Sequence, residues 1–455
     1  MNFQSPLISA VYLVLTHLFS LSWAVEVVED LKLVQLIFRH GDRAPIHTYK
    51  EDKVAESVWL NGFARLTPKG MKQQFELGKF FKQRYQKLLD PLYGPNQVYI
   101  RSSETDRTLQ SAEAFAAGLF PPDGEAKWDN VLGQMWRPIS VHTVPLSEEN
   151  LLTKKAPCPE YFRLKADLMN TDEMVKLYKE YRNVFDYVVN KSGEVATKRR
   201  DAMTVLEHVH DAVFCQLNSA GLERPEWMNE TVYNILHYLD AIEFHLQVGA
   251  NGDIPRARLA GGNLLALLLQ RMDERAGKAP LKRNDTRMFV YSGHDTTVAG
   301  LLATLEMYNY NDTLGFMGVP NYTATVIFEL FQNDSVRLLL KNDLDDIPNS
   351  EPQILKHARC DALCPLKQLR EVTKHCTVEN WNKECQSPVF GAEIDVSDVT
   401  VALVTVLLVI ILTTIALGCY KRRSRNTAAS HANVAAHGEN GVVVTYTRLN
   451  EDDNL

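Results

Sequence analysis

The chain has 455 residues, and its content of 45% hydrophobic and 23% charged residues is ordinary for a globular protein, which excludes disorder over most of its length. The formal net charge of -7 excludes a global positive field that would recruit a nucleic acid through its phosphates. Any recognition of an anion must therefore depend on a local group of residues.

The N-terminal segment 1–24 resembles a secretory signal peptide. An interrupted apolar run is followed by Ser22-Trp23-Ala24, a small-x-small pattern that suits cleavage after Ala24. The segment before the apolar run contains no Lys or Arg, so an uncleaved anchor is the alternative. Either interpretation sends the chain into the secretory pathway.

A second apolar segment, Val399–Cys419, contains no charged residue and is long enough to cross the hydrocarbon core of a bilayer. A basic segment at 421–423 follows it, and the positive-inside tendency places the polar tail 420–455 in the cytosol. We therefore expect a single-pass type I membrane protein with residues 25–398 in the lumen or outside the cell.

Six of the seven cysteines lie between the two apolar segments, and this even number suits three disulfides in an oxidising compartment. They are Cys158, Cys215, Cys360, Cys364, Cys376 and Cys385. The sequence leaves their pairing open, although Cys360 and Cys364 are close enough to close a small local loop. Six glycosylation sequons lie in the same region, at Asn190, Asn229, Asn284, Asn311, Asn321 and Asn333. Both patterns favour a luminal glycoprotein.

Three apolar segments, 32–38, 97–100 and 288–291, predict buried strands. Each leads into polar residues and then into a helical pattern. Repeated units of this kind predict an α/β fold with a mostly parallel central sheet flanked by helices. Because such sheets bind ligands outside the carboxyl ends of their strands, we expect the polar residues to form one site there.

Other segments complete the predicted fold. Thr67 and Pro68 are a suitable N-cap and first residue for a helix that continues to about Leu89. The pattern from about 164 to 267 is mainly helical and predicts an inserted α-helical cap domain. Apolar runs at 323–331 and 336–340 predict an antiparallel hairpin that closes the sheet.

The strongest chemical signal is the segment 39–45, RHGDRAP, which places two guanidinium groups around a histidine. Guanidinium groups match phosphate oxygens in charge and geometry. A neutral His40 would attack phosphorus and form a phosphohistidine that water then hydrolyses. Without a metal, the transferred phosphoryl group needs fixed positive donors, and Arg39, Arg43 and Arg101 would supply them.

The third strand delivers His294 and Asp295 to the start of a helix, where free N–H groups favour a bound anion. Asp295 is the candidate general acid that protonates the leaving oxygen, and His294 would help to hold the phosphoryl oxygens. A second His-Asp pair, His210-Asp211, lies inside a helical pattern, and we expect it on a solvated face or on a face of the cap domain.

Two arginines compete for the third phosphate-binding position. Arg101 is preferred because it directly follows its strand, whereas Arg107 is expected to pair with an acidic neighbour or to structure the start of the next helix. His47 and Asp42, near the nucleophile, are expected to support it or to lie at the surface. The sequence contains no zinc-like spacing and no nucleotide-binding loop, so we expect neither a metal nor a cofactor.

Four segments together resemble the histidine acid phosphatases over about residues 30–390: RHGDRAP at 39–45, LTPKG at 66–70, VYIRS with DRT within 98–108, and SGHD at 292–295. The resemblance implies an α/β sandwich of the phosphoglycerate-mutase-like superfamily and hydrolysis of phosphate monoesters, small or on proteins, at acid pH. It implies that His40 is the nucleophile and Asp295 the proton donor. The phosphate-binding positions that it implies are Arg39, Arg43, Arg101 and His294.

The same resemblance, closest to the prostatic and lysosomal branch, implies disulfides between Cys158 and Cys385 and between Cys360 and Cys364. The family's usual partner for Cys215 is missing, and our hypothesis is that Cys376 substitutes for it. In the tail, residues 446–449 (YTRL) are similar to signals that bind sorting adaptors, so we expect the lysosome, the endosome or the cell surface.

Two other functions remain open at this point. A phytase or another specialised phosphatase of the same superfamily would share the catalytic step and differ in the pocket for the leaving group. A receptor or adhesion protein would use the fold only to bind phosphorylated ligands, but the complete set of catalytic residues argues against it. The sequence also leaves open whether two copies form a homodimer.

Overall fold

The computed structural model describes residues 28–280, 286–308 and 318–386, together with 405, 407 and 410–418. The chain divides into two units, Met1–Ser387 and Pro388–Leu455. Several predicted features lie outside the described residues: the signal peptide, the predicted cytosolic tail with its sorting pattern, part of Val399–Cys419, and the sequons at Asn284 and Asn311. Among the helices that the structure describes, none is both long and apolar enough to span a bilayer.

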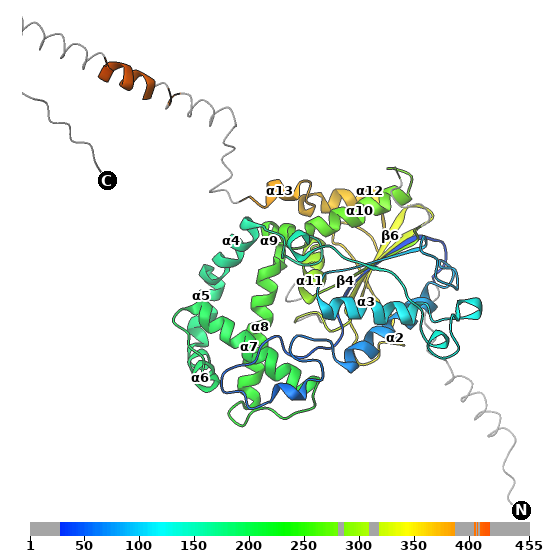
Figure 1. Cartoon of the computed structure of the whole chain (residues 1–455), viewed down its shortest axis with the longest axis horizontal. Coiled ribbons are helices and arrows are strands. Elements are labelled where there is room, and N and C mark those ends of the chain that lie inside the picture. The colour runs from blue at the N-terminus through cyan, green and yellow to red at the C-terminus, as the bar shows by residue number, and fades with distance from the viewer. Residues whose placement is uncertain are drawn as a thin grey trace, which may run out of the picture. The chain divides into compact units, whose positions relative to one another are not determined.

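A mixed sheet forms the centre of the first unit (Figure 1). Its strands are β1 (Leu31–Arg39), β2 (Val98–Ser102), β3 (Val141–His142), β4 (Met288–Gly293), β5 (Thr325–Phe331), β6 (Ser335–Lys341), β7 (Gln353–Leu355) and β8 (Leu363–Pro365). They are arranged in the order β3-β2-β4-β1-β5-β6-β7, with β8 also paired to β6. The three strands predicted to deliver the polar residues, β2, β4 and β1, are therefore direct neighbours.

Strands β1 to β4 pair in parallel, whereas β5 to β8 pair antiparallel. The predicted α/β class and the predicted hairpin, formed by β5 and β6, are both present. The sheet is mixed rather than mostly parallel, because the hairpin adds to β1 in the antiparallel direction and the short strands β7 and β8 continue that pattern. The parallel half carries the polar residues.

Helices cover both faces of the sheet (Figure 1). The α-helices of the first unit are α2 (Pro68–Arg84), α3 (Asp106–Leu119), α4 (Pro159–Asp167), α5 (Asp172–Glu180), α6 (Arg182–Ser192), α7 (Arg199–Asn218), α8 (Glu230–Val248), α9 (Ile254–Ala257), α10 (Asn263–Arg275), α11 (Asp295–Thr304), α12 (Leu366–Thr373) and α13 (Trp381–Glu384). A short π-helical stretch, Arg258–Gly262, joins α9 to α10. Helices α2 and α3 cover one face of the sheet, and α10, α11 and α12 cover the other.

Strand β1 shows why two cores form. Successive side chains of a strand point to opposite faces, so Leu33 and Ile37 pack into the core under α10 and α11. Val34, Leu36 and Phe38 pack into the core under α2 and α3. Because every one of these side chains is buried, β1 reads as a continuous apolar run rather than an alternating one.

The predicted helical insertion has a core of its own, built by α5 to α8 around residues such as Val188, Leu206 and Leu236. Figure 1 shows these helices beside the sheet and its covering helices. Towards the C-terminal end of the predicted cap, Leu264 and Leu265 pack into the sheet core instead. The helices before α9 therefore pack mainly against one another, and the helices from α9 onward pack against the sheet.

Two disulfides join the pairs Cys158–Cys385 and Cys360–Cys364, as the family resemblance implied. The proposed third pair is wrong, since Cys215 and Cys376 are both free and buried. The Cys215 thiol lies on α7 beside Arg43 and Tyr322. Cys376 lies in the segment after α12, where its carbonyl group closely approaches Gly262.

Candidate active site

The segment 39–45 begins where β1 ends, and backbone contacts fix it on both sides. The His40 N–H donates to the Gly293 carbonyl of β4 at 3.0 Å, and the Gln74 amide of α2 donates to the Arg39 carbonyl at 2.8 Å. A Cβ atom on Gly41 would lie 2.4 Å from the carbonyl oxygen of Gly70. Only a glycine lets the start of α2 come this close to the segment.

His40 is buried in a defined tautomer. Its Nδ1 lies 2.8 Å from the Gly41 carbonyl oxygen, which only accepts hydrogen bonds, so in the neutral ring Nδ1 carries the proton and Nε2 keeps its lone pair. Burial lowers the pKa of His40 well below its ordinary value, and the charges of Arg107 and Arg39 lower it further. The ring is therefore neutral, as a nucleophile must be.

Asp295 is the first residue of α11, and its carboxylate is held at both oxygens. Oδ2 pairs with the Arg39 guanidinium at 2.9 Å, and Oδ1 accepts the Thr296 N–H at 2.8 Å. Burial by itself would raise the pKa of Asp295, but the positive charges of Arg39 and Arg43 outweigh it and hold the pKa below its ordinary value. Without a ligand, this carboxyl group is ionised.

His294 lies edge-on to His40, with 5.7 Å between the ring centroids. Its Nδ1 is 3.3 Å from Arg107 Nη2 and its Nε2 is 3.0 Å from the Ser103 hydroxyl. An arginine only donates, so Nδ1 accepts and the proton sits on Nε2. Burial and the charge of Arg107 lower the pKa of His294 to about 3, which keeps the ring neutral.

The preference for Arg101 over Arg107 does not fit this geometry. Arg101 is still inside β2, and its guanidinium donates to both oxygens of the fully buried Glu149, at 2.9 and 3.1 Å. Arg107 lies in the first turn of α3 and reaches His294. Burial, followed by the charge of Arg43, lowers the pKa of Arg107 to about 10, because several guanidinium groups share a small space.

Asp211 makes a contact with the site that the sequence did not predict. It forms a two-point ion pair with Arg43, with Nη2 to Oδ1 at 2.8 Å and Nη1 to Oδ2 at 3.2 Å. The neighbouring His210 turns away and contacts Asp240 on α8. Of the two expected locations, a solvated face and a face of the cap domain, Asp211 takes the second, since its side chain is 24% exposed and turned towards the site.

Three guanidinium groups around His40 keep unused donors. The Nε atoms of Arg39, Arg43 and Arg107 are buried and have no hydrogen-bond partner in the described part of the chain. The Nε atoms of Arg101, Arg256 and Arg271 are also unpaired among the described residues, so the indication of a place for an anion is that three such groups gather around His40, whose pKa their charges lower. A phosphate group has the charge and the oxygen acceptors that these donors require.

Tyr322 is a further site residue that the sequence reasoning missed. Its ring lies under the Arg39 guanidinium, 4.4 Å from ring centroid to Cζ, and 5.9 Å from the His40 ring. No spacing signal pointed to it, since it is the middle residue of the sequon at Asn321, in the segment before β5. Asp42, in contrast, supports the segment as expected, because its carboxylate is buried and accepts the hydroxyl groups of Thr67 and Ser219.

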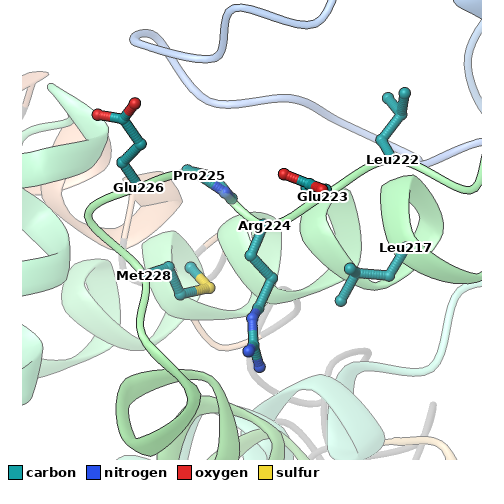
Figure 2. A pocket seen from close by; sticks show the side chains of 7 residues that line it. All are labelled: Leu217, Leu222, Glu223, Arg224, Pro225, Glu226 and Met228. Carbon is teal, nitrogen blue, oxygen red and sulfur yellow. The ribbon is translucent and has the colours of Figure 1, made fainter.

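A surface pocket at the end of α7 lies apart from these residues in the chain. It is lined by Leu217, Leu222, Glu223, Arg224, Pro225, Glu226 and Met228 (Figure 2). Figure 2 shows Arg224 extending between the ribbons, and its guanidinium lies over the Tyr233 ring at 5.5 Å. None of the six predicted site residues lines this pocket.

Comparison with known proteins identifies the class to which this fold and site belong. Residues 30–341 match the Histidine phosphatase superfamily (branch 2). The chain belongs to this family. It is 34% identical over 372 residues to the lysosomal acid phosphatase of Homo sapiens, covering 81% of this chain and 83% of that protein. It is also 34% identical over 363 residues to human prostatic acid phosphatase, covering 79% and 89% of the two chains.

These relatives confirm the predicted family and the enzyme class of phosphoric monoester hydrolases. Among solved structures, the phytase of Citrobacter braakii is similar with a TM-score of 0.54 at 20% identity, over 78% of this chain and 99% of that one. Hafnia alvei phytase in complex with tartrate has a TM-score of 0.56 at 17% identity, over 79% and 99% of the chains. At these identities the similarity establishes the fold alone.

Proposed function

We propose that the protein is an acid phosphatase that hydrolyses phosphate monoesters through a phosphohistidine on His40. The observation that carries this proposal is the state of His40, a buried neutral ring with its proton on Nδ1 and its Nε2 lone pair free, beside arginines with unused donors. The Nε2 atom attacks phosphorus while the bond to the leaving oxygen breaks. Arg39, Arg43 and Arg107 neutralise the charge on the other three phosphoryl oxygens.

Asp295 supplies the proton to the leaving oxygen in the first step. In the second step, the resulting carboxylate takes a proton from water, which attacks the phosphohistidine and releases inorganic phosphate with His40 restored. The products are one alcohol and one phosphate for each ester and water consumed. Asp295 is ionised in the free protein, so it must gain a proton before the first step.

Substrate binding itself favours that protonation. Arg39 pairs with Asp295 only while no anion competes for its guanidinium. A phosphate dianion that takes over Arg39 removes the charge that lowers the pKa of Asp295 and places a like charge nearby, and both effects raise that pKa. An acidic medium adds to this effect, which supports activity at acid pH.

For the phosphate ligands we propose Arg107 in place of Arg101, because Arg101 already pairs with Glu149. His294, with both ring nitrogens engaged by protein groups, holds Arg107 and Ser103 in the free state. When phosphate binds Arg107, the Nδ1 contact is free to break, and His294 then turns to a phosphoryl oxygen.

A luminal or extracellular location, with Val399–Cys419 as a type I anchor, is part of the proposal. It is supported by the uncharged segment before a basic one, by two disulfides in the first unit, and by the lysosomal relative. The asparagines of four sequons, Asn190, Asn229, Asn321 and Asn333, are exposed, as glycosylation requires. Protease protection of the full chain in membranes tests this orientation: digestion from the cytosolic side should remove only the tail.

The catalytic proposal is tested by mixing the purified full-length protein with a phosphate-labelled aryl phosphate and quenching the reaction. We expect acid-labile, base-stable label on wild type and none on His40→Ala, with phosphate release lost in the variant. Label and turnover that persist in His40→Ala would overturn the assignment of the nucleophile.

A further inference from the structure

The feature that the proposed mechanism does not use is Asp211, which lies on α7 in the helical insertion, 168 residues along the chain from Arg43. Its Oδ2 atom accepts from Arg43 Nη1 and also from the Ile46 N–H at 2.8 Å. One carboxylate therefore holds both the arginine and the backbone of the segment that carries the nucleophile.

Neighbouring residues on the same face of α7 make related contacts. Cys215, one turn further on, lies 3.7 Å from Arg43 Nη1 and 3.8 Å from the Tyr322 hydroxyl. Ser219, at the C-cap, donates to the Asp42 carboxylate at 2.8 Å. Residues four apart share a helix face, so a single stripe of α7 lies along residues 42–46.

The donors of Arg43 are divided between two directions. Asp211 takes both Nη atoms, and Nη1 also donates to the Ala44 carbonyl at 3.2 Å. The Nε donor and the second Nη2 proton lie on the other edge of the planar guanidinium, and Nε is buried without a partner in the described part of the chain. A guanidinium held at one edge presents the other edge as a fixed two-point donor.

We propose that Asp211 is a positioning residue for the phosphate site: it orients Arg43 so that the Nε edge meets a phosphoryl oxygen, and it thereby makes the helical insertion a working part of the site. This inference rests on the proposed function. Asp211 differs from Asp295, which also pairs with an arginine, because Asp211 takes no part in proton transfer. It stays on Arg43 throughout the reaction.

Whether phosphate binding strengthens or weakens when the charge of Asp211 is removed shows whether Asp211 acts through its charge or by orienting Arg43. If Asp211 acted only through its negative charge, removing that charge would strengthen the binding of a phosphate dianion. If it positions Arg43, removing it weakens binding, because the guanidinium then has several orientations and the bound phosphate must select one. An amide in place of the carboxylate keeps the volume of the side chain and loses one of the two acceptors.

The test uses the full-length protein with inorganic phosphate as a competitive inhibitor and an aryl phosphate as the substrate. For Asp211→Asn we expect the inhibition constant of phosphate to rise, and kcat/KM to fall, by roughly tenfold or more, the usual effect of losing a charge-assisted hydrogen bond. Asp211→Glu, which restores the charge at a longer reach, should recover only part of the loss. An unchanged or lower inhibition constant in Asp211→Asn would overturn the proposal.

A double-mutant cycle asks whether Asp211 acts through Arg43. We expect Arg43→Ala and the double variant Arg43→Ala/Asp211→Asn to have the same inhibition constant for phosphate, because Asp211 has nothing left to orient. Effects that multiply would contradict the proposal. If the wild-type protein has no phosphatase activity, the proposed function is refuted. This result differs from a failure of the positioning role of Asp211, in which the wild type is active and only the variants behave otherwise than expected.

The matched control is Asp201→Asn in the first turn of the same helix. Asp201 Oδ2 accepts the N–H groups of Thr197 and Lys198, so this variant weakens the start of α7 without a contact to residues 39–46. We expect a lower melting temperature with unchanged phosphate inhibition. If Asp201→Asn weakens phosphate inhibition as much as Asp211→Asn does, the effect of Asp211 is merely structural and the proposal fails.

Discussion

Arg107 and His294 meet at 3.3 Å, and this contact joins the start of α3 to the residue that follows β4, beside His40. Burial lowers the pKa of His40 most, and the charge of Arg107 lowers it more than any other single charge does. In the proposed mechanism, Arg107 therefore affects both phosphate binding and the protonation state of His40. Comparing Arg107→Ala with Arg101→Ala distinguishes an effect on phosphate binding and on the pKa of His40 from a general loss of stability.

Arg107→Ala should raise the pKa of His40, since a repelling charge disappears. Below that pKa the ring is protonated and cannot attack, so the acid limb of the kcat/KM profile should move to higher pH. We also expect kcat/KM at the optimum to fall by about a hundredfold, as is typical when a transition-state donor is lost. The measurement is kcat/KM for an aryl phosphate between acid and neutral pH.

Arg101→Ala is the matched control for this prediction. It leaves Glu149 buried without its cation, which should lower the melting temperature, but the acid limb should stay where it is in wild type. If Arg101→Ala moves the acid limb and Arg107→Ala does not, the sequence-based preference for Arg101 was right.

Asp295→Asn should slow the hydrolysis of alkyl phosphates by roughly a hundred- to ten-thousandfold, because the poor leaving group then departs without a proton. The p-nitrophenyl ester should lose less in the labelling step, since its leaving oxygen needs no proton. Burst kinetics with both esters measure the difference. Equal losses for both leaving groups would mean that Asp295 positions Arg39 rather than protonating the alcohol.

Gly41→Ala should destabilise the protein by about 1–3 kcal/mol and abolish most activity, because the new Cβ would lie 2.4 Å from the Gly70 carbonyl oxygen. Thermal melting and phosphate release measure both effects. Gly94→Ala is the control, since the nearest atom to its new Cβ is a side-chain nitrogen of Gln97 at 3.4 Å. Wild-type stability in Gly41→Ala would show that the two backbones can separate at no cost.

Two buried carboxyl groups in the helical insertion should make the free energy of unfolding depend on pH. Burial raises the pKa of Glu243 to about 7, although Lys165 opposes the shift, and Glu207 beside it is raised as well. A carboxyl group that binds its proton more tightly when folded stabilises the protein below the ordinary Glu pKa and loses this contribution as the pH rises through about 7. We therefore expect these two carboxyl groups to stabilise the insertion more at acid pH than above pH 7.

Glu243→Gln should therefore stabilise the protein at pH values above 7 by on the order of 2 kcal/mol and change little at pH 4. Denaturant unfolding at the two pH values measures the difference from wild type. Glu230→Gln, at the exposed start of the same helix, should leave the pH dependence unchanged. A Glu243→Gln variant that gains equally at both pH values would exclude titration of Glu243 as the cause.

The sequence alone determined the fold class and the residues at the ends of β1 and β4. Arg39, His40 and Asp295 could be placed together because Arg39 ends β1, His40 directly follows it and Asp295 lies two residues after the end of β4, and the carboxyl ends of parallel neighbours meet at one edge of a sheet. Short apolar runs in the sequence were enough to recognise these strands. The roles proposed within this group rest on the chemistry of phosphate.

Only the tertiary structure decided which other groups reach that edge. Strand β2 continues past Ile100, so Arg101 still points across the sheet to Glu149, whereas the first turn of α3 carries Arg107 back to His294. Asp211 reaches Arg43 because α7 packs along residues 42–46. Such contacts depend on where a strand ends and on how distant helices pack, and local sequence patterns carry neither kind of information.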